Sequence, residues 1–233
     1  MSELGQEMTD RGGTSIDWHG QRLVLLPDRA VLWPGQRIAF VADVHLGKVE
    51  AFHRGGIPVP AECGRSDLDR LAAIVERSGI ETLVILGDLF HCRSGMVDEM
   101  LDSAIAWRKR IAGTRVLLVR GNHDARAGGW PAELAIEPVD EGTMLGPFDL
   151  RHHPVERPNS PVLCGHVHPA VVMGSRLGRG RSALRAPCYW IKPSQLMLPA
   201  FGRFTGCKKI TPSRGDRVFA IGPGAVIETA LAG

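Results

Sequence analysis

The sequence predicts an α/β fold in which a sheet with parallel crossovers precedes a mainly β half. Strand-like apolar runs alternate with amphipathic helices between residues 37 and 119, the order of consecutive β-α-β units. Beyond Gly128 the apolar runs shorten while proline and glycine increase, which favours short strands and turns. With 44% hydrophobic and 23% charged residues the chain has a globular composition, which argues against disordered, collagen-like and coiled-coil classes.

The predicted sheet begins with a hairpin and a third strand. Residues 22–26 and 30–33 are apolar runs joined by a Pro-Asp-Arg turn, and a further apolar run covers residues 37–42.

Two amphipathic helices separate the next strands. Ser66 is the predicted cap of the first helix and Gly79 ends it, while the second helix is predicted over residues 96–112. The strands Thr82–Leu86 and Arg115–Val119 follow these helices and complete the β-α-β-α-β order.

The remaining chain predicts shorter β segments, at residues 142–150, 161–163, 171–173, 195–198 and 218–227. No repeat or linker separates the two halves, so we expect a polar tail over residues 1–20 and a single domain over residues 21–233.

The sequence predicts a cytoplasmic protein without membrane contact. Its longest apolar runs have five residues, far below the ~18 that span a bilayer. The N-terminal segment is acidic and polar, unlike a secretory signal. Five scattered cysteines without a C-x-x-C pair fit reduced thiols.

Positive charge is concentrated in the C-terminal half. The whole chain has a formal net charge of +3, yet residues 176–217 contain ten basic residues and one acid, Asp216. Such a stretch is either a solvated face or a groove for a polyanion. Interleaved aromatic rings favour a nucleic-acid groove, although the same rings also suit a core.

Seven of the nine histidines lie in polar clusters directly after predicted strands. The clusters are DVH at 43–45, GDLFH at 87–91, GNHD at 121–124, HH at 152–153 and GHVH at 165–168. Surface histidines and capping aspartates are the alternative interpretation, and a lone D-x-H triplet means little. Loops at strand ends gather distant side chains at one sheet edge, so the five clusters together indicate one site.

The residue types in these clusters suit transition metals. Asp, Asn and His supply oxygen and nitrogen ligands for Mn, Fe, Zn or Ni rather than for Ca or Mg. Asp88, at the end of the central apolar strand, is the best placed carboxylate to bridge two cations. Glycines before Asp88, Asn122 and His166 are expected to permit tight turns.

These motifs, in this order and at these intervals, closely resemble the calcineurin-like metallophosphoesterases, a superfamily of dinuclear phosphoesterases. The resemblance runs from about Arg22 to the C-terminus and implies a four-layer α/β/β/α sandwich of two mixed β-sheets flanked by helices. LGKVEAFHRGGIPVP at 46–60 and LPAFGRFTG at 198–206 resemble the bacterial DNA-ligase-associated branch, described as DNA damage response endonucleases.

The resemblance implies two divalent ions, with Mn²⁺ preferred and Fe, Zn or Ni as alternatives. One ion would be held by Asp43, His45 and His168, and the other by Asn122, His166 and either His152 or His153, with Asp88 bridging them. His152 is preferred because it matches the first position of the family's H-G-H or H-G-D motif.

Further roles follow from the same resemblance. His123 matches the residue placed over the leaving group, and His91 resembles its counterpart in double-strand-break repair nucleases, which share GDLFH. Asp124 either orients the His123 ring or caps the following turn. His53 and Arg54 either contact substrate phosphate or lie in a solvated loop.

The expected activity is two-metal hydrolysis of phosphodiesters, with DNA as the leading substrate and DNA ligase and helicase as possible repair partners. No helix-turn-helix or zinc finger is evident, so binding without sequence preference is expected. The alternatives are a phosphoesterase for small nucleotide or cyclic nucleotide diesters, and a metal-stabilised module that recruits repair partners without turnover. The sequence does not indicate an oligomeric state.

Overall fold

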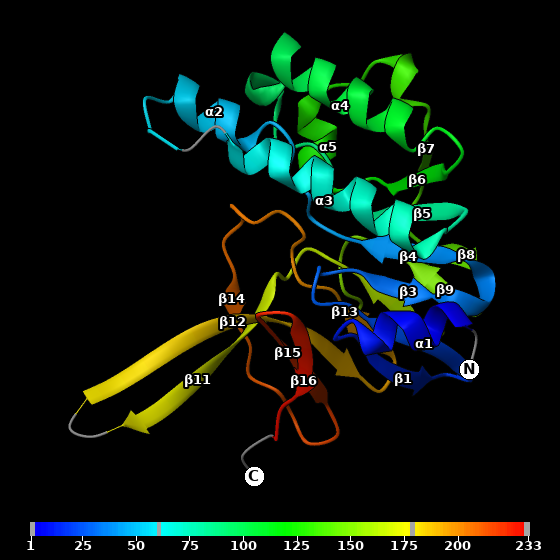
Figure 1. Ribbon diagram of the computed structural model, residues 1–233, viewed down its shortest axis with the longest axis vertical. Helices are drawn as coiled ribbons and strands as arrows, with labels where there is room; N and C mark the ends of the chain where they lie inside the picture. The colour runs from blue at the N-terminus through cyan, green and yellow to red at the C-terminus, as the bar shows by residue number, and fades with distance from the viewer. Residues whose placement is uncertain (1–2, 60–61, 178–179, 231–233) are drawn as a thin grey trace.

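The computed structural model describes residues 3–59, 62–177 and 180–230 (Figure 1). Two β-sheets share one apolar core, and helices pack on the other face of the first sheet. None of the described helices combines the length and the apolar composition needed to cross a bilayer.

The first sheet has seven strands that follow one another in chain order. Strands β1 to β4 pair antiparallel, whereas β4 to β7 pair in parallel. The strands are β1 (Thr14–Trp18), β2 (Gln21–Leu25), β3 (Val31–Trp33), β4 (Ile38–Val41), β5 (Thr82–Leu86), β6 (Arg115–Val119) and β7 (Ile136–Val139). The parallel part places the carboxyl ends of β4, β5 and β6 side by side at one edge.

Helices cover the outer face of the first sheet. The α-helices are α1 (Glu3–Asp10), α2 (Lys48–Arg54), α3 (Glu62–Ser78), α4 (Asp98–Arg110) and α5 (Asn122–Ala127), and the 3₁₀ helices are η1 (Pro34–Gln36), η2 (Arg93–Gly95) and η3 (Ala132–Leu134). Helices α3 and α4 lie side by side (Figure 1), and Leu71 and Trp107 pack into the same core as Leu83 of β5. Helix α3 begins before Ser66, so the predicted cap lies inside the helix.

The second sheet has nine strands and is also mixed. The strands are β8 (Thr143–Leu145), β9 (Phe148–Leu150), β10 (Val162–Cys164), β11 (Pro169–Leu177), β12 (Gly180–Lys192), β13 (Gln195–Met197), β14 (Lys208–Lys209), β15 (Arg217–Gly222) and β16 (Ala225–Glu228). The β11–β12 hairpin projects from the body (Figure 1). The side chains of Arg176, Arg179 and Arg181, which belong to the predicted basic stretch, lie outside the described residues.

A second apolar core fills the space between the sheets. Phe40 of the first sheet and Phe148 of the second contact edge to face, with ring centroids 6.5 Å apart. Tyr189 of β12 is fully buried, and its hydroxyl lies 2.6 Å from Leu26 O and 2.9 Å from Ala30 O. The C-terminal half is thereby anchored to the turn of the β2–β3 hairpin.

The predicted sandwich of two mixed sheets flanked by helices is confirmed. The polar tail expected over residues 1–20 is not what the structure shows, because α1 and β1 lie there and Met8, Ile16 and Trp18 are buried. The two apolar residues of β1 alternate with a polar one, a strand signal obscured by the polar residues around it. The single domain over residues 21–233 stays a prediction.

Replacing Tyr189 with phenylalanine is expected to lower the free energy of unfolding by about 0.5–1.5 kcal/mol, because the buried hydroxyl hydrogen bond to Leu26 O or Ala30 O is lost while both carbonyls still accept a backbone N–H. Urea denaturation of Tyr189→Phe and wild-type protein measures the difference. An unchanged unfolding midpoint would show that the hydroxyl does not anchor the second sheet.

Candidate metal centre

Candidate ligand side chains from both sheets meet at one edge of the molecule. Asp43, Asp88 and Asn122 follow β4, β5 and β6, while His152 and His166 follow β9 and β10 of the second sheet. Among the described residues, four groups of side chains place their ligand atoms within 4.8 Å of one another: Asp43, His45 and His168; Asp43, Asp88 and His152; His152, His153 and His166; and His45, His91 and His123. The structure therefore brings together residues that are far apart in the sequence.

Five of the candidate ligands have a left-handed backbone. Their φ angles are 56° at Asp43, 56° at His45, 52° at Asp88, 66° at His166 and 50° at His168. This conformation costs a non-glycine residue roughly 1–2 kcal/mol, and such strain clusters at functional sites. The loops hold each other in place: Asp43 N–H donates to Gly87 O at 3.1 Å, and His45 N–H donates to Asp88 O at 2.9 Å.

The glycines before three ligands are required chiefly for space. A Cβ atom at Gly87 would lie 2.1 Å from His152 Nδ1, one at Gly121 would lie 2.2 Å from Asp88 Oδ1, and one at Gly165 would lie 2.7 Å from Asp43 Oδ2. Of these three glycines only Gly87 has a positive φ, so the expected tight turn explains the glycine at that position alone. The close approach of a neighbouring side chain explains the glycine at all three positions.

One group of ligand atoms surrounds Asp43. His168 Nε2 lies 3.2 Å from Asp43 Oδ1, and His45 Nε2 lies 4.0 Å from Asp88 Oδ2. Burial lowers the pKa of His45 to about 2, so its imidazole is neutral and keeps a lone pair for a cation.

The second group surrounds His152, which is fully buried. Its Nε2 lies 3.4 Å from Asp88 Oδ2, 3.2 Å from Asn122 Oδ1 and 3.1 Å from His166 Nδ1. Asp88 thus faces both groups of ligand atoms, as a bridging carboxylate would.

The orientation of the imidazole rings fits metal binding. His152 Nδ1 lies 3.0 Å from Leu86 O, and His168 Nδ1 lies 3.1 Å from Gly206 O. Donation to these carbonyls directs each Nε2 lone pair toward the carboxylates, as in metal-ligating histidines held by backbone acceptors.

The buried charge in this site fits cations as well. Asp43 Oδ1 and His45 Nε2 are buried without a hydrogen-bond partner among the described residues. Burial lowers the pKa of His152, but Asp88 and Asp43 outweigh it and raise this pKa to about 9. For Asp88, burial acts in the opposite direction and raises the pKa. The contacts of Asp88 with His152 outweigh this effect and lower the pKa of Asp88 to about 2. The carboxylates therefore attract positive charge at this point, and the mixed oxygen and nitrogen donors suit Mn, Fe, Zn or Ni.

His91 and His123 form a stacked pair beside the ligands. Their ring centroids are 4.9 Å apart with an interplanar angle of 17°. His123 Nδ1 lies 2.6 Å from His91 O, which leaves Nε2 as its available ring nitrogen. Burial lowers the pKa of His91 to about 4, with Lys48 adding to the effect, so His91 is neutral near pH 7.

Of the two roles expected for Asp124, its contacts support the cap of the turn rather than contact with the His123 ring. Its carboxylate is buried and accepts hydrogen bonds from the backbone N–H groups of Asp88, Phe90 and Gly121, at 2.8, 2.9 and 3.0 Å. The His123 ring is positioned by the His91 carbonyl instead. Asp124 caps the turn that starts α5 and ties the β5 loop to the β6 loop.

The geometry favours His152 over His153 as a ligand, because the side chain of His153 is 44% exposed and lies 3.1 Å from Glu141 Oε1. His53 is exposed, and its Nε2 lies 2.6 Å from Val59 O. It lines a cavity next to Arg65 that contains none of the candidate ligands. Arg54 is exposed at the end of α2, and the contact of His53 and Arg54 with substrate phosphate stays a prediction.

Two residues near the site were missed by the sequence analysis. Burial lowers the pKa of Lys48, and Asp43 opposes this effect. Glu141 accepts hydrogen bonds from the N–H groups of His152 and His153, at 2.8 and 2.7 Å. Lys48 lies three positions after a predicted ligand, and this spacing could have indicated that it lies near the site. No pattern in the sequence indicates Glu141, because its role depends on a contact between loops.

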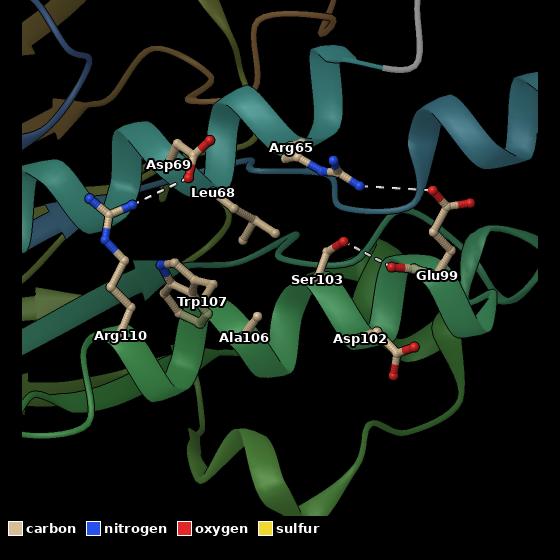
Figure 2. A pocket seen from close by; sticks show the side chains of 9 residues that line it. All are labelled: Arg65, Leu68, Asp69, Glu99, Asp102, Ser103, Ala106, Trp107 and Arg110. Atoms are coloured by element: carbon tan, nitrogen blue, oxygen red, sulfur yellow. Dashed lines mark hydrogen bonds and ion pairs between the residues drawn. The ribbon is translucent and has the colours of Figure 1, made fainter.

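A separate cavity of about 610 Å³ lies between α3 and α4 (Figure 2). Ion pairs of Arg65 with Glu99 and of Arg110 with Asp69 connect its two walls. Its lining includes no candidate ligand, so this cavity is distinct from the cluster described above.

The calcineurin-like phosphoesterase family matches residues 36–166 of the chain. Among solved structures, the nuclease MPE of Pseudomonas putida is 40% identical with a TM-score of 0.79, and the alignment covers 93% of this chain and 100% of that one. The phosphoesterase Yfce of E. coli is 16% identical with a TM-score of 0.39, and the alignment covers 84% of this chain and 99% of that one. Comparison with curated proteins finds no match.

Gly121→Ala is expected to weaken metal binding, because the new Cβ would displace the Asp88 carboxylate. For wild-type protein, Mn²⁺ at about a hundred times its Kd should add about 2.7 kcal/mol of stability and raise Tm by roughly 5–10 °C. Differential scanning calorimetry should show a smaller rise for the variant. Gly113→Ala is the matched control, since nothing lies within 4 Å of a Cβ there. An equal Mn²⁺-induced rise in the two variants would contradict the role of Gly121.

Proposed function

Because the chain belongs to the calcineurin-like phosphoesterase family and is similar to a nuclease, we propose that it hydrolyses DNA by a two-metal mechanism. Family membership makes it a metal-dependent hydrolase of phosphoester bonds. The observation that carries the finer proposal is the position of Asp88 between two groups of ligand atoms. A carboxylate shared in this way is what a dinuclear centre needs.

Seven residues are assigned as metal ligands in this proposal. One cation would be held by Asp43, His45 and His168, the other by Asn122, His152 and His166, and both by Asp88. Two divalent cations, when bound, supply Lewis acidity toward the phosphoryl oxygens and lower the pKa of water. We assign Mn²⁺ as the preferred cation, with Fe, Zn or Ni as alternatives, because the oxygen donors of Asp43, Asp88 and Asn122 suit Mn²⁺ while the imidazoles admit the other metals.

His123 is assigned as the acid that protonates the leaving oxygen. The contact of Nδ1 with His91 O fixes the ring and leaves Nε2 for the substrate. The backbone N–H of His123 donates to Asp88 Oδ1 at 2.8 Å, which ties the backbone that carries this ring to the carboxylate assigned as the bridge. His91 supports this ring from the stacked position and contacts His45, with 3.4 Å between their Nδ1 atoms.

DNA is proposed as the substrate on two grounds. The Pseudomonas putida protein, similar over 93% of this chain, is a nuclease. The excess of basic residues over residues 176–217 suits a phosphodiester backbone bound without sequence preference. The stretches at 46–60 and 198–206 extend the proposal to DNA repair, with ligase and helicase as partners.

His123→Ala is expected to slow hydrolysis of a diester with a poor leaving group by about 10²–10⁴-fold, because the leaving oxygen loses its proton donor. Hydrolysis of bis-p-nitrophenyl phosphate should slow less, since p-nitrophenolate needs little protonation. Rates with both substrates at equal metal content provide the measurement. Unchanged turnover on the poor leaving group would refute the assigned role.

Mn²⁺ restored after chelation is expected to recover cleavage of both circular and linear DNA. Circular DNA has no ends, so its cleavage isolates internal hydrolysis. Gel assays across a Mn²⁺ titration measure this recovery, with the chelated protein as control. Protein that hydrolyses only small nucleotide diesters would contradict DNA as the substrate, and protein inert on every diester would contradict the enzyme.

A further inference from the structure

A cavity of about 620 Å³ lies apart from the candidate ligands and is lined mainly by arginine. We call it the arginine pocket; its basic residues are Arg11, Arg29, Arg70, Arg77, Arg185 and Arg203. Asp28 is the only acid in its lining. These side chains come from the turn after α1, the β2–β3 turn, α3, β12 and the loop before β14, all of which belong to the described chain.

Only part of this positive charge is compensated within the protein. Arg70 pairs with Asp67 at 2.8 Å, Arg77 with Asp28 at 2.7 Å, and Arg11 with Glu7 at 3.0 Å. No described carboxylate lies within 4.0 Å of the guanidinium groups of the remaining three, which are Arg29, Arg185 and Arg203.

The cations in the pocket disfavour one another. Burial lowers the pKa of Arg70 to about 10, Asp67 opposes this effect, and the charges of Arg203 and Arg29 add to it. Burial also lowers the pKa of Arg29, again with a contribution from Arg203. The Nε of Arg70 is buried without a hydrogen-bond partner among the described residues. An anion in the pocket would relieve this repulsion.

The pocket and the candidate metal centre share one loop, residues 200–206. Arg29 donates to Ala200 O and Gly202 O on the pocket side of this loop. On the other side, Gly202 N–H donates to Asp43 O at 3.1 Å, and Gly206 O contacts His168 Nδ1. Arg203 lies in this loop and lines the pocket, and its backbone N–H donates to Asp67 Oδ2 at 3.0 Å.

We propose that the arginine pocket binds backbone phosphates of a nucleic-acid strand whose scissile diester lies at the metal centre. This proposal rests on the proposed function, and it adds a second site that favours polynucleotides over small diesters. Arginine suits this task, because its planar guanidinium binds phosphate oxygens in pairs. A volume near 620 Å³ is in the range of sites for ligands of nucleotide size.

The test compares Arg185→Ala/Arg203→Ala with wild-type protein. Both side chains are exposed, so folding should persist, and circular dichroism checks it. Anisotropy of a labelled single-stranded oligonucleotide, measured with EDTA over a range of salt, gives Kd without cleavage. Binding should weaken by about tenfold or more, and the slope of log affinity against log salt should fall by about 1 to 2. Arg203→Lys alone should weaken binding less than Arg203→Ala, because lysine keeps the charge but loses the paired contacts of the guanidinium.

The control is Lys109→Ala/Arg115→Ala, which removes the same charge from α4 and from the start of β6. Equal losses of affinity in the two double variants would contradict phosphate binding in the arginine pocket and would leave the proposed function intact. Inorganic pyrophosphate that competes as strongly as the oligonucleotide would also contradict the proposed strand binding, since the pocket would then be a small-anion site. Hydrolysis of bis-p-nitrophenyl phosphate by wild-type protein tests the proposed function separately.

Discussion

Two buried carboxylates that face the same space impose the constraint on which this structure depends. Asp43 and Asp88 are almost fully buried, and a buried carboxylate is costly unless it is paired or hydrogen-bonded. One oxygen of each accepts a backbone N–H, from His166 at 2.9 Å and from His123 at 2.8 Å. The other oxygen of each carboxylate faces imidazole nitrogens. Bound cations would stabilise this arrangement, and the loops with left-handed residues hold it in place.

The surrounding fold supplies the supports for these loops. Parallel pairing of β4, β5 and β6 places the loops at one edge, and the second sheet contributes its histidines from the facing side. Buried Asp124 ties two of the loops together through three backbone donors. Asp67 and Arg70 do the same for the loop that holds Arg203, because Asp67 accepts both Arg70 and the Arg203 N–H. The arginine pocket and the candidate metal centre are thereby connected through one segment of backbone.

The sequence predicted the α/β order and the residues of the cluster, because strand ends in a parallel sheet converge whatever the loop details. It did not predict β1, since one alternation of Ile16 and Trp18 is too short a signal in a polar segment. The roles of Glu141 and Asp124 depend on contacts between loops distant in sequence, which periodicity does not report. The same reason explains why Gly121 was assigned to turn geometry rather than to the space beside Asp88.

The central claim is that Asp88 joins two cation sites, and metal content tests it most directly. Mass spectrometry of Mn²⁺-loaded, desalted protein should give two ions per wild-type chain. Asp88→Asn should retain fewer than one ion per chain, because both sites lose a shared anionic ligand. A wild-type chain that holds a single ion, or an Asp88→Asn chain that still holds two, would contradict the account.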